Sequence, residues 1–248
     1  MRRETIFPYG IKEKYVRNRL FCFHHAGGSS FIFKNWVKYY KNIDVIPVDV
    51  PNRYKELGEQ HFESLIDNVV KAILKISNGE KIFIYGHSLG ALFAFETAYQ
   101  IQERSDKYVE KIFVAGRHAP CEKNPLEFKC SEGERGLYER LVKDGEMDKK
   151  VLKSNTFKNE FLPLIFDDYR IGEEYHYQGE RLKAKIITLS GSRDMEASYE
   201  IMKLWNKVTN IGIKQYEIEG KHFFPYGEKE KEVLEIIAQE IYRRKESI

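Results

Sequence analysis

The stretch Lys81-Ile-Phe-Ile-Tyr-Gly-His-Ser-Leu-Gly90 combines a strand, a sharp turn and the start of a helix. Its first half is apolar and rich in β-branched and aromatic residues, which is typical of a buried strand. The glycines flanking Ser88 permit a tight turn that leaves the serine hydroxyl projecting above the sheet. The following helix would place free N–H groups and its positive dipole end beside that oxygen. The stretch therefore predicts that Ser88 is a nucleophile; the structural alternative is a glycine-rich turn with a capping serine.

Similar apolar runs predict the other strands, at residues 20–23, 45–48, 112–114, 186–189 and 214–218. Amphipathic helices are predicted between or after them, at residues 62–73, 89–102 and 229–243. Strands that alternate with helices need crossover connections, which give a mostly parallel sheet with helices on both faces. The predicted fold class is therefore α/β.

The alternation breaks in residues 119–183, which contain no convincing strand. Helical spacing is present there, for example at Leu162, Ile165, Phe166 and Tyr169. A structureless connection of that length is uncommon in a compact domain. We therefore expect a helical lid over residues 119–183, inserted in a single domain over residues 1–248.

Composition restricts the class of protein. Apolar residues make up 42% and charged residues 32%, and the net charge is only +3, which argues against disorder and gives no sign of nucleic-acid binding. The three cysteines form no CxxC pair, so we expect no zinc site and a reducing compartment. The first 19 residues carry charges rather than a long apolar run, so we expect no secretory leader, and no run of about 18 apolar residues is present. We expect a cytoplasmic protein that has no membrane partner and is monomeric by default.

A serine nucleophile needs a base, and that base needs a third group to orient it. His222 follows the predicted strand at residues 214–218, so it would lie in the crevice at the carboxyl end of the sheet, beside Ser88. It is therefore the predicted base. Structural interpretations are available for the other histidines: His24, His25, His61, His87, His118 and His176.

The orienting carboxylate is predicted at Asp194, in Ser190-Gly-Ser-Arg-Asp194 after the strand at residues 186–189. The order Ser, Asp, His is that of α/β-hydrolases. The earlier strand, at residues 112–114, is followed by Ala115-Gly-Arg-His-Ala119, which holds no carboxylate. Glu196 is the nearest alternative acid.

The tetrahedral oxyanion formed by serine attack needs fixed hydrogen-bond donors. The amide of Leu89 is one candidate, and the loop His24-His-Ala-Gly-Gly-Ser-Ser30 offers a second, the amide of Ala26. A phosphate-binding loop is the competing interpretation of Gly27 and Gly28. The GxxxxGK[ST] and GxGxxG patterns of such loops are both missing.

Taken together, these residues make the chain resemble a type II thioesterase, the stand-alone α/β-hydrolase that accompanies nonribosomal peptide and polyketide synthases. Asn52 stands where that family usually has glycine, and asparagine tolerates left-handed backbone angles. The resemblance spans nearly the whole chain and rests on Phe23-His-His-Ala-Gly-Gly-Ser29, Val50-Pro-Asn-Arg53, Tyr85-Gly-His-Ser-Leu-Gly-Ala-Leu-Phe-Ala-Phe-Glu96, Ala115-Gly-Arg-His-Ala-Pro120, Phe161-Leu-Pro-Leu-Ile165 through Tyr177, and Gly220-Lys-His-Phe-Phe224.

The resemblance implies hydrolysis of acyl, aminoacyl or peptidyl thioesters from the phosphopantetheine arm of a carrier protein, which would clear misloaded or stalled synthases. It implies no metal and no cofactor held by this chain itself. The family's nucleophile, acid and base map to Ser88, Asp194 and His222, and its oxyanion donors to the amides of Ala26 and Leu89. The lid would shape the acyl pocket, with walls at Phe161, Phe166 and Tyr169, for which plain lid packing is the alternative. A basic rim for an acidic carrier is expected at Arg53, Arg117 and Lys221.

Two other functions are compatible with the same residues. An oxygen-ester hydrolase or an acyltransferase would use the same three side chains, because the triad does not distinguish the leaving group. A catalytically silent α/β-hydrolase that serves only as a binding partner is the alternative from a different class, and the intact set of three side chains argues against it.

Overall fold

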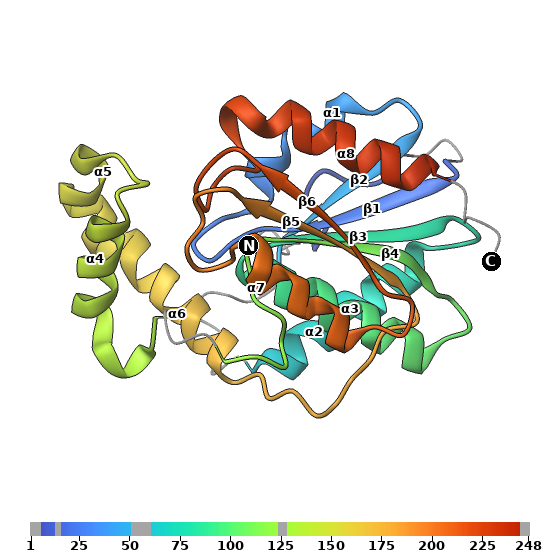
Figure 1. Ribbon diagram of the computed structural model, residues 1–248, viewed down its shortest axis with the longest axis horizontal. Coiled ribbons are helices and arrows are strands. Elements are labelled where there is room, and N and C mark those ends of the chain that lie inside the picture. Colours follow the sequence, from blue (N-terminus) through green and yellow to red (C-terminus); the bar gives the residue numbers. More distant parts are fainter. Residues whose placement is uncertain (1–5, 13–15, 51–60, 124–127, 244–248) are drawn as a thin grey trace.

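A parallel sheet of six strands forms the centre of the computed structural model, which describes residues 6–12, 16–50, 61–123 and 128–243 (Figure 1). The strand order is β2-β1-β3-β4-β5-β6, and every neighbouring pair is parallel. The α/β prediction is confirmed, and each predicted strand falls within an observed one. The strands are β1 (Asn18–Phe23), β2 (Ile43–Val48), β3 (Lys81–His87), β4 (Val109–Ala115), β5 (Lys185–Gly191) and β6 (Ile213–Ile218).

Helices cover both faces of the sheet: α2, α3 and α7 lie on one face, and α1 and α8 on the other (Figure 1). The α-helices are α1 (Trp36–Tyr39), α2 (Phe62–Ile76), α3 (Leu89–Arg104), α4 (Gly133–Asp144), α5 (Lys149–Lys153), α6 (Leu162–Glu173), α7 (Tyr199–Lys203) and α8 (Glu230–Tyr242). Single turns of 3-10 helix lie at Ser30–Phe33, Cys130–Glu132, Leu204–Val208 and Gly227–Lys229, and a π-helical turn at Phe157–Phe161. Within the described ranges, no helix is both long and apolar enough to cross a membrane.

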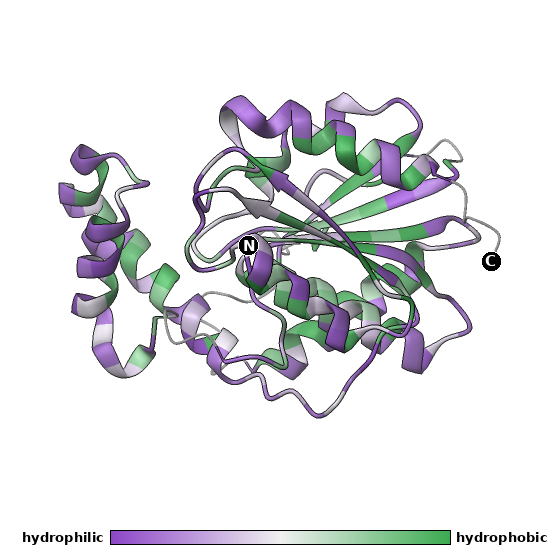
Figure 2. Ribbon diagram, viewed as in Figure 1, coloured by the Kyte–Doolittle hydropathy of each residue, from purple (hydrophilic) through white to green (hydrophobic). Residues whose placement is uncertain are grey.

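Two hydrophobic cores form because the strands are buried on both faces. In β1, Phe21 and Phe23 pack toward α2 and α3, whereas Leu20 and Cys22 pack toward α1 and α8. This alternation explains why the strands read as continuous apolar runs. Figure 2 shows the hydrophobic colour concentrated on the strands and on the sheet-facing sides of the helices.

The connection between β4 and β5 carries α4, α5 and α6, which extend to one side of the sheet (Figure 1). This segment has a hydrophobic cluster of its own, which accounts for its helical spacing. The buried members of that cluster are Phe128, Leu137, Leu152, Phe157, Leu162 and Ile165. The helices thus lie within the predicted lid, residues 119–183, above the carboxyl ends of the strands.

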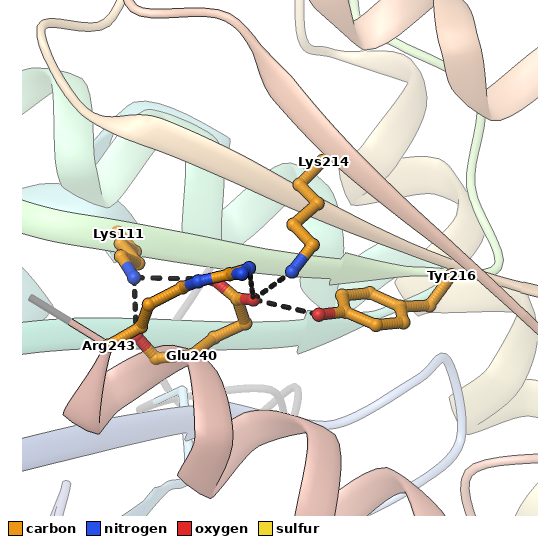
Figure 3. Close-up of polar contacts among 5 residues, drawn as sticks. All are labelled: Lys111, Lys214, Tyr216, Glu240 and Arg243. Carbon is orange, nitrogen blue, oxygen red and sulfur yellow. Dashed lines mark hydrogen bonds and ion pairs between the residues drawn. The ribbon is translucent and has the colours of Figure 1, made fainter. Parts of the chain in front are cut away.

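A buried carboxylate links α8 to the sheet (Figure 3). The side chain of Glu240 is only 1% exposed and accepts hydrogen bonds from Lys214 Nζ at 2.6 Å and the Tyr216 hydroxyl at 2.7 Å. Lys111 Nζ lies 3.3 Å and Arg243 Nη1 3.4 Å from the same carboxylate. Burial alone would raise the pKa of Glu240. The bonds from Lys214 and Tyr216, together with the Lys111 ammonium, outweigh burial and lower that pKa from 4.5 to about 2.

We expect Glu240→Gln to lower the free energy of unfolding by about 2–4 kcal/mol at pH 7, because it leaves two lysines without their counter-charge. The folded-state pKa of Glu240 lies below its ordinary value, so the stabilisation is complete above pH 4.5 and declines as the pH falls toward 2. Urea unfolding of both proteins should therefore show a smaller difference at pH 3 than at pH 7. Glu235→Gln, at an exposed position on the same helix, serves as the control. An equal difference at both pH values would contradict this account.

Candidate active site

Ser88 occupies a strained turn between β3 and α3. Its φ of 54° and ψ of −122° make it the one non-glycine residue with positive φ in the part of the chain that the structure describes. Such a conformation costs about 1–3 kcal/mol and persists where the surroundings enforce it. A Cβ on Gly86 would overlap the carbonyl of Gly90, and a Cβ on Gly90 would overlap the backbone of Phe23 and His24. Close backbone approach, rather than flexibility, therefore requires both glycines.

Asp194 and His222 meet at the carboxyl ends of β5 and β6. His222 Nδ1 donates to Asp194 Oδ2 at 2.9 Å. The other carboxylate oxygen, Oδ1, accepts from the amides of Glu196 at 3.0 Å and Ala197 at 3.2 Å. Asp194 is 1% exposed and His222 19%, so the carboxylate is fixed from beneath while the imidazole stays accessible. The alternative acid, Glu196, instead forms an ion pair with Arg140 of the lid.

A buried histidine, His87, packs against the predicted base, His222. His87 Nε2 donates to the backbone carbonyl of His222 at 2.9 Å, and the two ring centroids are 4.9 Å apart. Burial, together with the neighbouring His222 and His25, lowers the pKa of His87 well below its ordinary range. His87 therefore stays neutral and places no like charge beside His222. Apart from the position of His87 in the turn motif, no sequence pattern predicts this contact.

One cavity of about 620 Å³ contains the predicted residues Ser88, Asp194, His222 and Ala26 on its lining. Leu89, the first residue of α3, directly follows Ser88. The lid supplies a largely apolar wall, which comprises Leu141, Met147, Val151, Phe157, Phe161, Ile165 and Tyr169. A cavity of this size and composition suits a ligand with an apolar chain.

The three lid aromatics singled out from sequence take different positions. Phe161 and Tyr169 line the cavity, and Phe161 remains half exposed. Phe166 instead packs within the lid, with its ring centroid 6.2 Å from that of Phe128. Tyr169 takes part in both environments, because its ring centroid also lies 5.2 Å from that of Phe128.

Polar contacts connect the lid to the loop that carries His222. The Glu146 carboxylate, between α4 and α5, accepts from the amides of His222 and Phe223, each at 3.1 Å. Lys221 Nζ donates to the Asp144 carbonyl at 3.3 Å, so this predicted rim residue lies against the lid as well as the cavity. Glu146 was not predicted, because an acidic residue in a polar helical segment carries no sequence signal. The rim residue Arg53 lies outside the described residues.

The amides of Ala26 and Leu89 are both available as donors. Neither N–H donates a hydrogen bond to another described residue. The amide of Leu89 belongs to the first turn of α3, where helix N–H groups lack an intrahelical acceptor. Among the described residues, no group of three or more histidine, cysteine or acidic side chains could hold a metal ion. The N–H groups of Ala26 and Leu89 can bind an oxyanion, because neither already donates to a described acceptor.

Comparison with known proteins adds the following. A model of the thioesterase domain family matches residues 18–241. The chain is similar to linear gramicidin dehydrogenase LgrE of Brevibacillus parabrevis, at 30% identity over 86% of this chain and 83% of that protein. It is also similar to gramicidin S biosynthesis protein GrsT of Aneurinibacillus migulanus, at 28% identity over 90% and 88%. The solved structure of RedJ, a thioesterase from the prodiginine biosynthetic pathway in Streptomyces coelicolor, superposes with a TM-score of 0.79 at 26% identity, covering 91% of this chain and 92% of that one.

Proposed function

Because the chain belongs to the thioesterase domain family, as the sequence resemblance predicted, we propose that it hydrolyses acyl thioesters held on the phosphopantetheine arm of a carrier protein. One observation carries this proposal: the hydrogen-bonded pair of His222 and Asp194 lines the same cavity as the strained Ser88. The relatives GrsT and RedJ are named for gramicidin S and prodiginine biosynthesis. We therefore assign the chain to the same kind of assembly line, where it would remove wrong or stalled acyl groups.

The geometry supports a two-step mechanism. Asp194 holds the Nδ1–H of His222, so Nε2 is the nitrogen that takes the proton from Ser88. The Ser88 oxygen attacks the thioester carbonyl, and the oxyanion binds the amides of Ala26 and Leu89. The C–S bond then breaks, and the thiol leaves with the proton from His222. Water, activated by His222, attacks the acyl-enzyme and releases the acid, which restores Ser88. No metal and no cofactor of this chain's own enters these steps.

Thioester hydrolysis fits the site better than the dehydrogenase activity in the name of LgrE. A dehydrogenase that uses a dinucleotide would be expected to carry the GxGxxG pattern after a strand, and the sequence lacks it. Gly27, in the loop after β1 that carries Ala26, instead lines the same cavity as Ser88.

The proposal is tested with a panel of acyl-loaded carrier proteins and, in parallel, with small thioesters and oxygen esters of the same acyl groups. We expect kcat/KM for the loaded carriers to exceed that for the matched oxygen esters by at least about tenfold, or ~1.4 kcal/mol of transition-state binding. Released acids are identified by mass spectrometry, with an unacylated carrier as the control. A preference for the oxygen esters would overturn the thioester assignment, and transfer of the acyl group to another acceptor would identify an acyltransferase.

A further inference from the structure

In the loop after β1, hydrogen bonds hold both peptide groups of Ala26: the His25–Ala26 peptide before it and the Ala26–Gly27 peptide after it. The carbonyl of His25 accepts hydrogen bonds from His24 Nδ1 at 2.8 Å and from the amide of Gly28 at 3.0 Å. Because a trans peptide points its N–H opposite its C=O, these two bonds also set the direction of the Ala26 N–H. On the other side, the carbonyl of Ala26 accepts from His25 Nδ1 at 2.8 Å.

The peptide group between Ala26 and Gly27 carries the Ala26 carbonyl and the Gly27 N–H. This N–H donates a hydrogen bond to a carboxylate of the lid. Asp168 Oδ2 of α6 accepts this bond at 2.6 Å. Asp168 is buried, with 3% of its surface exposed, and 141 positions separate it from Gly27 in sequence. Gly27 has a φ of 73°, which is in the left-handed region that favours glycine. The orientation of the Ala26–Gly27 peptide is part of this turn conformation.

The same face of α6 touches both segments that supply the oxyanion donors. Ile165, Asp168 and Gly172 share this face, because they are spaced by three and four residues. The side chain of Ile165 lies so near Gly27 that a Cβ there would overlap it. A Cβ on Gly172 would come within 2.9 Å of Leu89 Cδ1. Helix α6 therefore contacts the Ala26 loop with one turn and Leu89 with the next.

We propose that Asp168 is a positioning residue for the oxyanion hole: it holds the Ala26–Gly27 peptide, and thereby keeps the preceding His25–Ala26 peptide in the position where its Ala26 N–H faces the oxyanion. Helix α6 is then a structural part of the hydrolytic site as well as a cover for the acyl cavity. This inference rests on the proposed acyl transfer to Ser88, but not on whether the leaving atom is sulfur or oxygen. It follows that the donor geometry depends on how the lid docks.

Two substitutions at position 168 test the role. Loss of a whole oxyanion donor costs about 100–1,000-fold in turnover, so a misplaced donor in Asp168→Ala should lower kcat by about 10–100-fold. KM should change by less than about threefold, because the acyl cavity wall is unaltered. Asp168→Asn keeps an acceptor oxygen without the charge, so it should retain more activity than Asp168→Ala.

Asp167→Ala is the matched control. Asp167 neighbours Asp168 on α6, and its carboxylate lies 3.9 Å from Arg170 Nε. This variant should keep the parent kcat. Thermal unfolding of all the variants shows whether the fold is retained, and Asp168→Asn provides the kinetic comparison if Asp168→Ala does not fold.

A second readout separates positioning from packing. An alkyl boronic acid forms a tetrahedral adduct on an activated serine and occupies the oxyanion hole. Its Ki should rise in the Asp168 variants in parallel with the loss of kcat, on thioesters and oxygen esters alike. If the parent protein hydrolyses only oxygen esters, the proposed function fails while this test still applies. A variant that loses thermal stability or raises KM, but keeps the parent kcat and boronate Ki, would overturn the positioning role.

Discussion

Ser88→Ala is expected to lower kcat by about 10⁴–10⁶-fold while leaving the fold intact, because the members of a triad act as one unit. Alanine keeps the Cβ and removes only the hydroxyl, so the variant meets the same backbone strain at φ 54° as the parent. The Tm of Ser88→Ala should consequently be close to that of the parent protein. Turnover of a loaded carrier or a matched thioester measures the effect.

The control for this prediction is Ser105→Ala, at the opposite end of α3 from Ser88. Its hydroxyl donates to the Ile101 carbonyl at 2.8 Å, far from the cavity lining. We expect normal turnover from this variant. Residual hydrolysis near the parent rate in Ser88→Ala would show that another group is the nucleophile.

His222→Ala should reduce kcat by a similar factor of about 10⁴–10⁶, since Ser88 then has no base to accept its proton. The change also leaves the buried Asp194 without its partner at 2.9 Å, so a loss of stability is expected together with the loss of activity. His176→Ala, at an exposed histidine, is the control for both effects.

The double variant distinguishes a shared mechanism from two separate contributions. If Ser88 and His222 act together, Ser88→Ala combined with His222→Ala should be no slower than either single variant. Multiplied losses in the double variant would mean that the two residues do not share a step. Single-turnover kinetics on all three proteins provide the comparison.

The strands of the sheet could be predicted because the residues that favour a strand locally are also the apolar residues that a buried sheet needs. Runs such as residues 186–189 are apolar except for Thr188, as expected of a strand buried on both faces, and they lie inside β5. The turn at Ser88 was equally visible, because only glycines fit where Gly90 meets the backbone of Phe23. Residues that follow parallel strands must gather at one edge, which explains why Asp194 and His222 could be placed beside each other.

The contacts of the lid could not be predicted in this way. Glu146 and Asp168 bond to backbone amides of loops that are distant in sequence, and those bonds exist only because of how α4 and α6 dock. No periodicity or motif specifies that docking. Phe166 shows the same limit of sequence patterns: Phe166 and Tyr169 both pack on Phe128, yet only Tyr169 also lines the cavity.

The central claim is that His222 activates Ser88. Reaction with an alkyl fluorophosphonate, followed by peptide mapping, tests it most directly, because this reagent forms a stable ester with an activated serine hydroxyl. We predict one adduct in the parent protein, on Ser88, and a labelling rate in His222→Ala that is lower by about 10³-fold or more. An adduct on a different residue, or labelling of Ser88 at the parent rate in His222→Ala, would contradict the account.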